Sequence, residues 1–553
     1  MLSPIRNIIV LSTLPRVISC LHVLFYILLL GKSHIDFTDS LIDTLVENGH
    51  TVDLIIARMN SHVKTNGTSQ AARKYIYGFT EDSPWSKTPH LLDPFLPKTR
   101  TWKEHIHYME ISTEICEIGL SDPGLHKFVQ NQKYDIGIST EYDYCGFALM
   151  KHYSIPSIVS VSSMAVLDQQ SISAGMSNSA AVTNAAFETE DLQMLWGKFK
   201  NLFNWAHINF IVYPYCQQMQ ATVIHKYLGK HIVMTDLIRE IDLAFVNSNE
   251  IIETPREIPA KIKYIGGINL RKSKKLDAET ERIVSARNSR GLVVFCFGTQ
   301  VPASLFPSEI KKSFVSAFRR FPDYTFLWKY ELQDEDEDRR IFSNVTNLKL
   351  MKWLPQNDLL NDPRTVSFIS HVGLNSYVEA SFAGVPILAV PLFVDQPHNA
   401  QSGQAIGTTF VLDKTKLTTE NIVHGLEQAI GTTFVLDKTK LTTENIVHGL
   451  EQVLYNPSYS LNAKRISKML HERPDRPQKL FIDWLEFAAR NPLLHRNLNL
   501  PGQNMSFFEY YCLDVIGIFV ASVGVVLFLL FRVIRGVFRI SKRVKVSKKE
   551  KVQ

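Results

Sequence analysis

Short apolar runs alternate with amphipathic stretches along most of this chain, and that alternation restricts its fold more than any other feature. Residues 22–30, HVLFYILLL, predict a buried strand; Phe37, Leu41 and Leu45 then share one helix face, and TVDLII at 51–56 predicts the next strand. The same order recurs from Gly291, where GLVVFCFG precedes an amphipathic helix over residues 307–321. Such alternation is typical of parallel α/β sheets, and 553 residues suffice for two such domains.

An uncharged apolar run, residues 515–531, lies near the C-terminus. Aromatic residues at 507–511 precede it, and nine Lys and Arg against one Glu follow it. We expect a transmembrane helix over 513–531 and a basic cytoplasmic tail over 532–553, with a buried core helix as the alternative. Because the tail is more positive than the whole chain, whose net charge is +6, the remainder is slightly acidic. Nucleic acid is therefore not an expected partner.

The basic tail after the span predicts a single-pass type I protein whose folded domains are lumenal. Residues 1–20 predict an imperfect signal peptide, since Pro15 and Arg16 interrupt its apolar run. Lys549 and Lys551 resemble the dilysine retrieval signal, which indicates the endoplasmic reticulum membrane, although a basic tail can contain this spacing by chance. Asn66, Asn344 and Asn504 begin glycosylation sequons. The six scattered cysteines signal neither a disulfide framework nor a zinc site, and we expect no metal.

A segment of 24 residues occurs twice in tandem without a single change, at 404–427 and 428–451. Structural repeats diverge at their surface positions and usually number three or more, so this pair indicates a recent duplication or an error in the gene sequence. Each copy predicts one short strand and one helix, capped by Thr418 or Thr442. One copy fits an α/β domain, and the other must be accommodated outside it.

In the first predicted domain, His34 follows the strand 22–30 and lies where open α/β sheets bind ligands. Glu141 and Asp143 follow another predicted strand, YDIGIST at 134–140, and either carboxylate could orient the imidazole at the same sheet edge. Each residue alone is also compatible with an ordinary polar loop.

The tract from Trp353 to Gln396 contains WLPQNDLL and then FISHVGLNSYVEASFAGVPILAVPLFVDQ. It resembles the signature of the UDP-glycosyltransferases, the family that includes the UDP-glucuronosyltransferases. The resemblance extends through residues 456–459, EFAARN at 486–491 and the C-terminal apolar run, and GKSH and EYDYCGF are similar to nematode members. It implies two Rossmann-like doubly wound α/β domains facing a cleft (the GT-B type) with a C-terminal transmembrane helix. The acceptor domain would span 21–256, the linker 257–289 and the UDP-sugar domain 290–506.

Physical chemistry assigns donor-binding roles within that tract. Trp353 offers a flat face to uracil, and the Gln356 amide can meet the base edge or the ribose. A strand-to-helix turn favours a pyrophosphate through free amides and the helix dipole. It contains His371, Gly373, Asn375 and Ser376. Glu379 can accept hydrogen bonds from ribose hydroxyls.

The resemblance adds further donor residues to these. It implies that Asp395 and Gln396 hold the hydroxyls of the transferred sugar, and that Gly298, Thr299 and Arg256 touch the phosphates. Taken singly, each position has an ordinary alternative: Trp353 in the core, His371 as a cap, Glu379 on a helix surface.

The family reaction implies inversion without a metal ion or cofactor, with His34 as the base and Glu141, or its rival Asp143, as its partner. The partners expected are a UDP-sugar donor, a small lipophilic acceptor and the bilayer; a homo-oligomer is compatible with the sequence. The expected donor is UDP-glucuronate. The alternatives are UDP-glucose, or a UDP-sugar-binding homologue impaired by the duplication. Thr140 occupies the position of the family's acidic residue and Val394 that of a glycine, so both depart from the pattern.

Overall fold

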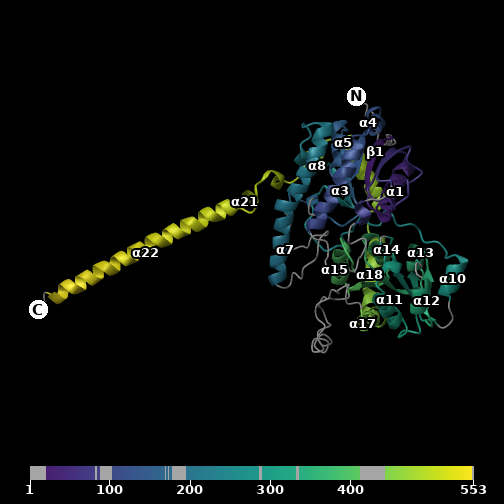
Figure 1. Cartoon of the computed structure of the whole chain (residues 1–553). Coiled ribbons are helices and arrows are strands. Elements are labelled where there is room, and N and C mark those ends of the chain that lie inside the picture. Colours follow the sequence, from purple (N-terminus) through teal and green to yellow (C-terminus); the bar gives the residue numbers. More distant parts are fainter. Residues whose placement is uncertain are drawn as a thin grey trace, which may run out of the picture.

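A computed structural model describes residues 20–80, 84–87, 102–167, 170–171, 174–176, 195–285, 289–299, 301–331, 335–411 and 442–550. The body consists of two α/β domains, and one long helix leaves it (Figure 1). Most of the predicted signal peptide lies outside the described residues.

The first domain contains a parallel sheet of seven strands in the order β3-β2-β1-β4-β5-β6-β7. Its centre is apolar because β1 and β2 are covered on both faces. The strands are β1 (His22–Leu29), β2 (Thr51–Arg58), β3 (Arg73–Gly78), β4 (Ile136–Thr140), β5 (Ile158–Ser162), β6 (Leu243–Val246) and β7 (Ile262–Tyr264). The helices of this domain are α1 (Lys32–Glu47), α3 (Trp102–Leu120), α4 (Pro123–Gln130), α5 (Cys145–His152), α7 (Leu195–His207), the π-helix η2 (Ile208–Val212), α8 (Tyr213–Leu228) and α9 (Met234–Arg239), with the short turn η1 (Pro84–Lys87).

The second domain contains a parallel sheet of six strands in the order β10-β9-β8-β11-β12-β13. Its core is rich in aromatic rings; Phe295, for example, stacks on Trp328 with 4.3 Å between ring centroids. The strands are β8 (Leu292–Cys296), β9 (Thr325–Lys329), β10 (Leu348–Met351), β11 (Thr365–Ser370), β12 (Ile387–Ala389) and β13 (Thr409–Val411). The helices are α10 (Ala278–Val284), η3 (Ala303–Leu305), α11 (Ser308–Phe318), α12 (Glu335–Phe342), α13 (Gln356–Leu360), α14 (Leu374–Ala383), α15 (Gln396–Ala405), α17 (Thr443–Tyr455) and α18 (Pro457–Glu472).

The chain crosses between the domains differently from the boundaries drawn on the sequence. Strand β7 pairs with β6, so the first sheet extends into residues expected to form the linker. After α18 the chain returns to the first domain with α19 (Pro477–Arg490) and α20 (His495–Leu498). There the ring of Phe481 packs on the ring of Phe245, with 4.9 Å between their centroids. The strong amphipathic pattern of residues 477–490 does not specify which of two apolar sheets it covers, and only the packed structure does.

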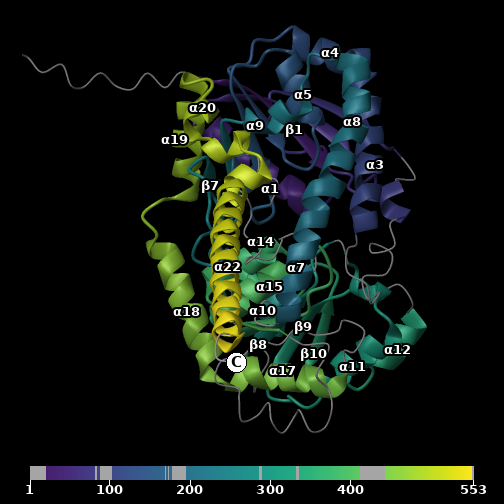
Figure 2. The same cartoon turned by 90° about the vertical axis from the view of Figure 1, so that its left-hand side faces the viewer.

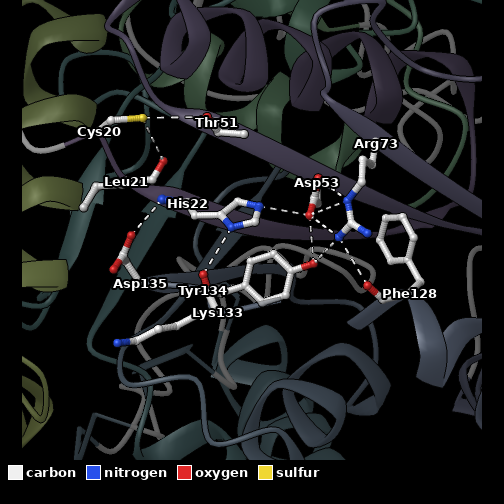
Figure 3. A network of polar contacts seen from close by, with 10 residues as sticks. All are labelled: Cys20, Leu21, His22, Thr51, Asp53, Arg73, Phe128, Lys133, Tyr134 and Asp135. Carbon is white, nitrogen blue, oxygen red and sulfur yellow. Dashed lines mark hydrogen bonds and ion pairs between the residues drawn. The ribbon is translucent and has the colours of Figure 1, made fainter. Parts of the chain in front are cut away.

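An ion-pair network centred on a buried carboxylate joins the amino ends of the first strands (Figure 3). The Asp53 carboxylate, 1% exposed, accepts hydrogen bonds from His22 Nε2 at 3.0 Å, Tyr134 Oη at 2.9 Å and the Arg73 guanidinium. Because ligands bind at the opposite, carboxyl ends of parallel strands, this network fixes the sheet rather than a substrate.

A disulfide joins Cys116 of α3 to Cys145 at the start of α5. The expectation that the cysteines signal no disulfide was therefore wrong for this pair. The two residues are 29 positions apart and fit no local spacing motif, so only the packing of the two helices brings them together.

The described part of the duplicated region contributes one strand from the first copy and one helix from the second. Strand β13 belongs to the first copy and extends the sheet at its edge. Helix α17 belongs to the second copy, and its N-cap Thr442 accepts a hydrogen bond from the amide of Asn445 at 3.3 Å, as predicted for a cap. Residues 412–441, including the alternative cap Thr418, lie outside the described residues.

After η4 (Pro501–Asn504) and α21 (Phe507–Tyr510), the chain ends in α22 (Leu513–Glu550). Leu513–Arg539 is long and apolar enough to span a membrane, and its most apolar window of 18 residues has a mean hydropathy of 2.6 and no buried part. The helix continues through most of the segment expected to be the tail (Figure 1).

Candidate active site

The carboxyl ends of both sheets contribute to one cavity of about 250 Å³. Ligands of open α/β sheets bind at this edge. From the first domain the cavity is lined by His34, Glu141 and Asp143, as predicted. From the second domain it is lined by the predicted residues Gly298, Thr299, His371, Gly373, Asn375, Ser376, Asp395 and Gln396.

His34 lies in the first turn of α1, directly after β1. Its Nδ1 is 3.1 Å from the Ser163 hydroxyl, and its ring meets the ring of Tyr142 edge-on, with 5.2 Å between centroids. The Tyr142 hydroxyl is in turn 2.7 Å from the Ser163 hydroxyl. Burial lowers the pKa of His34 to about 4, so the imidazole is neutral at physiological pH.

Neither candidate carboxylate forms a hydrogen bond with His34 in the described structure. Glu141 accepts one from Gln170 instead. Both oxygens of Asp143 are buried, and no side chain among the described residues donates a hydrogen bond to them. Burial raises the pKa of each carboxyl to about 7, although the Cys145 amide acts in the opposite direction on Asp143. Both side chains therefore line the site without orienting the imidazole directly.

Ser163 was not predicted from the sequence. It directly follows β5, whose carboxyl end borders the same cavity. The serine pair at the end of IVSVSS was the available signal, but serines after strands are too common to be singled out. Thr140, at the position where the family has an acid, accepts a hydrogen bond from the Leu28 amide at 3.0 Å and so supports the sheet.

The amino end of α14 points at the cavity from the second domain. Gly298 and Gly373 leave room for His371, because a Cβ on them would lie 2.9 and 2.7 Å from its Nε2. Burial, assisted by the Lys329 charge, lowers the pKa of His371 to about 4. The Asn375 amide reaches the first domain, donating to the Ser33 carbonyl at 3.3 Å. These contacts hold the helix terminus beside His34.

The loop after β12 brings in the pair expected to hold the sugar. Asp395 accepts a hydrogen bond from Asn399 at 2.8 Å, and burial raises its pKa to about 6. Gln396 accepts hydrogen bonds from the amides of Leu392 and Phe393, which shape the loop. Val394 has a φ of 58°, a left-handed conformation that β-branched residues rarely adopt.

Three other predicted donor residues form a group beside the cavity rather than in its lining. Gln356 donates hydrogen bonds to Glu379 at 2.6 Å and to Ser376, a lining residue, at 3.1 Å. Burial raises the pKa of Glu379 to about 7. The Trp353 ring is 59% exposed, and the Lys329 ammonium lies 5.3 Å from its centroid. An open indole face next to a cation suits a nucleotide, and Lys329 was missed because a single lysine in a strand carries no motif.

Arg256 lies away from the lining of the cavity. Its side chain is 6% exposed, donates to the Val166 carbonyl at 3.1 Å and pairs with Glu253 at 3.5 Å. Thr254, nearby, is 2.7 Å from the Ser402 hydroxyl, so this segment joins the two domains. The structure therefore gives Arg256 contacts within the protein and none at the cavity.

Two solved structures of glycosyltransferases have a similar fold. CalG4, the calicheamicin glycosyltransferase, matches with a TM-score of 0.55 and 14% identity, over 86% of this chain and 99% of that one. Phytolacca americana UGT2, complexed with UDP-2fluoro-glucose and pterostilbene, matches with a TM-score of 0.53 and 14% identity, over 84% and 99%. At this identity the likeness shows the fold alone, which is the two-domain GT-B fold predicted.

Sequence comparison extends over nearly the whole chain. It is 27% identical to UDP-glucuronosyltransferase 1A9 of Mus musculus, over 90% of this chain and 89% of that protein. It is 24% identical to UDP-glucuronosyltransferase 2B15 of Homo sapiens, over 93% and 92%. The family model described as "UDP-glucoronosyl and UDP-glucosyl transferase" matches residues 27–434 and again 426–550, and the two matches overlap inside the duplicated segment. The chain therefore belongs to the UDP-glucuronosyl and UDP-glucosyl transferase family.

Proposed function

We propose that this UDP-glycosyltransferase transfers glucuronic acid from UDP-glucuronate to hydroxyl groups of small lipophilic acceptors, with inversion. The observation that carries the proposal is that His34 and the amino end of α14 line one cavity from opposite domains. Apolar side chains of the first domain, among them Met109, Phe147 and Leu167, line the same cavity and suit a lipophilic acceptor. The relatives named above as UDP-glucuronosyltransferases support the choice of sugar.

In this mechanism His34 is the general base. A neutral imidazole whose Nδ1–H donates to Ser163 keeps the Nε2 lone pair available. It takes the proton of the acceptor hydroxyl while that oxygen attacks the anomeric carbon and the bond from this carbon to the UDP oxygen breaks. The products are the glycoside with inverted configuration, UDP and a protonated His34, which then releases its proton. The reaction as written uses no metal ion and no cofactor.

The second domain would stabilise the leaving group. The backbone amides at the start of α14 would face the position where negative charge grows on the β-phosphate. We place uracil on the exposed face of Trp353, the ribose hydroxyls at the Gln356–Glu379 pair, and the sugar hydroxyls at Asp395 and Gln396. Arg256 is left out of this donor site, since its guanidinium is held by Glu253 and Val166.

We further propose that the folded domains are lumenal in the endoplasmic reticulum and anchored by Leu513–Arg539. The Cys116–Cys145 disulfide supports this compartment, because disulfides persist where the surroundings are oxidising. The asparagines of all three sequons are exposed, as glycosylation requires.

A second donor, UDP-glucose, is favoured by a different observation. The described residues that line the cavity include neither lysine nor arginine. A glucuronate carboxylate in a buried site is normally met by such a cation, whereas glucose needs only hydrogen bonds.

The test is donor turnover in microsomes that contain the expressed protein. UDP-glucuronate and UDP-glucose are compared on a panel of phenols and alcohols, with the His34→Ala variant as the control for chemistry. Faster turnover of UDP-glucuronate supports the first donor, and faster turnover of UDP-glucose the second. Equal turnover by wild type and His34→Ala would refute the base, and no turnover of either donor would support the impaired homologue.

A further inference from the structure

A second cavity, of about 330 Å³, lies beside the active-site cavity and next to the start of the apolar C-terminal helix. Aromatic side chains form much of its wall: Trp205, Phe210, Tyr213, Phe507, Tyr510 and Tyr511. Tyr144, Tyr213 and Ile238 line both cavities, so these three side chains stand between them. The donor chemistry proposed above uses none of these residues.

The wall of this second cavity is continuous with the membrane anchor. Phe507 lies 5.9 Å from Phe210 and 6.4 Å from Trp205, measured between ring centroids. The membrane-spanning candidate begins at Leu513, six residues after Phe507. Aromatic side chains just before a span lie at the membrane interface. The side of the cavity formed by Phe507, Tyr510 and Tyr511 would therefore lie at the level of the lipid headgroups.

An exposed apolar surface adjoins the same region. It consists of Leu195, Trp196, Phe199, Phe203, Phe210 and Ile211 on α7 and η2, each at least 56% exposed. We call it the α7–η2 face. Lys198 and Lys200 are exposed between these residues, and a helix that combines Trp, Phe and Leu with lysines is typical of the membrane interface.

The arrangement of the helices identifies the bilayer as the partner of this face. Figure 1 shows α7 at the edge of the body from which α22 departs, inclined to the direction of α22. In Figure 2, seen from that side, α7 and α22 are both at the front of the molecule. A bilayer spanned by α22 would thus lie next to the side of the body that α7 forms.

We propose that the α7–η2 face rests on the bilayer. We further propose that lipophilic acceptors dissolved in the membrane reach the active site through the second cavity, which lies beside this face. The inference rests on the proposed acceptor class. It explains why apolar residues remain exposed on α7 and why residues of α21 line the second cavity.

The route is tested with Gln217→Trp, which narrows the cavity, and the matched control Gln218→Trp, one residue further on α8 and outside the lining. The full chain is reconstituted in phosphatidylcholine vesicles and given a long-chain alkylphenol or a water-soluble phenol. We expect Gln217→Trp to lower kcat/KM about tenfold for the alkylphenol, to leave the soluble phenol unchanged, and Gln218→Trp to affect neither. Equal effects on both phenols, or no effect on the alkylphenol, would overturn the route.

The docking is tested without turnover. A fluorophore is attached at Phe203→Cys, or at Glu279→Cys on α10 across the body, with the exposed Cys20 and Cys512 replaced by serine. Brominated lipids should quench the first fluorophore and not the second. If brominated lipids quench the two fluorophores to the same extent, or quench neither, docking is refuted even when the enzyme is active. Quenching at Phe203→Cys in a chain that glycosylates no acceptor would support docking while the proposed function fails.

Discussion

The Nδ1 of His34 lies 3.1 Å from the hydroxyl oxygen of Ser163. The hydroxyl of Tyr142 lies 2.7 Å from the hydroxyl of Ser163 and also accepts a hydrogen bond from the Ser163 backbone amide at 2.8 Å. Hydroxyl groups thus orient the imidazole at the place where a carboxylate was expected. A hydroxyl fixes the ring but supplies no negative charge for the imidazolium that forms during proton transfer.

Ser163→Ala is expected to lower kcat about tenfold to a hundredfold, because a base displaced from its attack geometry loses much of its effect. The donor KM should change little, since Trp353, Gln356 and Glu379, which we propose hold the nucleoside, lie outside the lining of the cavity that Ser163 borders. The Ser163→Thr variant keeps the hydroxyl and should retain most of the activity. Wild-type kcat in Ser163→Ala would show that the serine does not position His34.

Asp143→Asn is expected to stabilise the protein at pH 8 and to leave it unchanged near pH 4. Burial raises the folded-state pKa of Asp143 to about 7, above its unfolded value, so the stability from the neutral carboxyl is present at low pH and is lost as the pH rises through 7. The gain at pH 8 should be about 2–4 kcal/mol in the free energy of unfolding. Thermal melting at both pH values measures it.

An equal melting temperature for wild type and Asp143→Asn at pH 8 would mean that the native carboxylate has a partner after all. Turnover of the same variant separates the two candidate carboxylates. Activity retained in Asp143→Asn but lost in Glu141→Gln would assign the acidic role to Glu141.

Val394→Gly is expected to raise the kcat/KM for the donor several-fold. Its left-handed backbone costs about 1–2 kcal/mol for a residue with a Cβ, and its side chain lines the cavity beside Asp395. Val394→Ala makes room but keeps the strain, so its melting temperature should lie below that of Val394→Gly. The opposite order would show that packing of the valine outweighs the backbone strain.

The sequence specified the parts of the site that depend on local order and left open those that depend on packing. Strand-helix alternation predicted both sheets, and a turn before an amphipathic helix predicted the α14 terminus, because both follow from neighbouring residues. Ser163 and Lys329 contact the site across strands, and the Arg256 guanidinium pairs with Glu253 outside the lining of the cavity. Those positions follow from how strands, helices and loops pack against one another within each domain, which periodicity does not encode.

Deleting residues 404–427 is expected to preserve the fold, because the remaining copy supplies both the edge strand and the helix that the structure takes from two copies. A connection shortened by 24 residues also has a closure entropy more favourable by about 1 kcal/mol. The melting temperature should therefore be equal or higher, and donor turnover equal or faster. A shortened chain that melts earlier or no longer binds UDP would show that the second copy has acquired a structural role.

Cys116→Ser is expected to lower the free energy of unfolding by about 2–4 kcal/mol, since the disulfide restricts the unfolded chain over 29 residues. The loss of stability should be larger than that caused by altered packing at Cys116 alone. Cys145 begins α5 two residues after Asp143, so the disulfide also restrains the loop between β4 and α5 that borders the cavity. A reducing agent should lower the melting temperature of the wild type to that of Cys116→Ser and leave the variant unchanged. If the reducing agent lowers the melting temperatures of the wild type and of Cys116→Ser equally, the effect does not come from the Cys116–Cys145 disulfide. This disulfide would then no longer support a lumenal location of the enzyme.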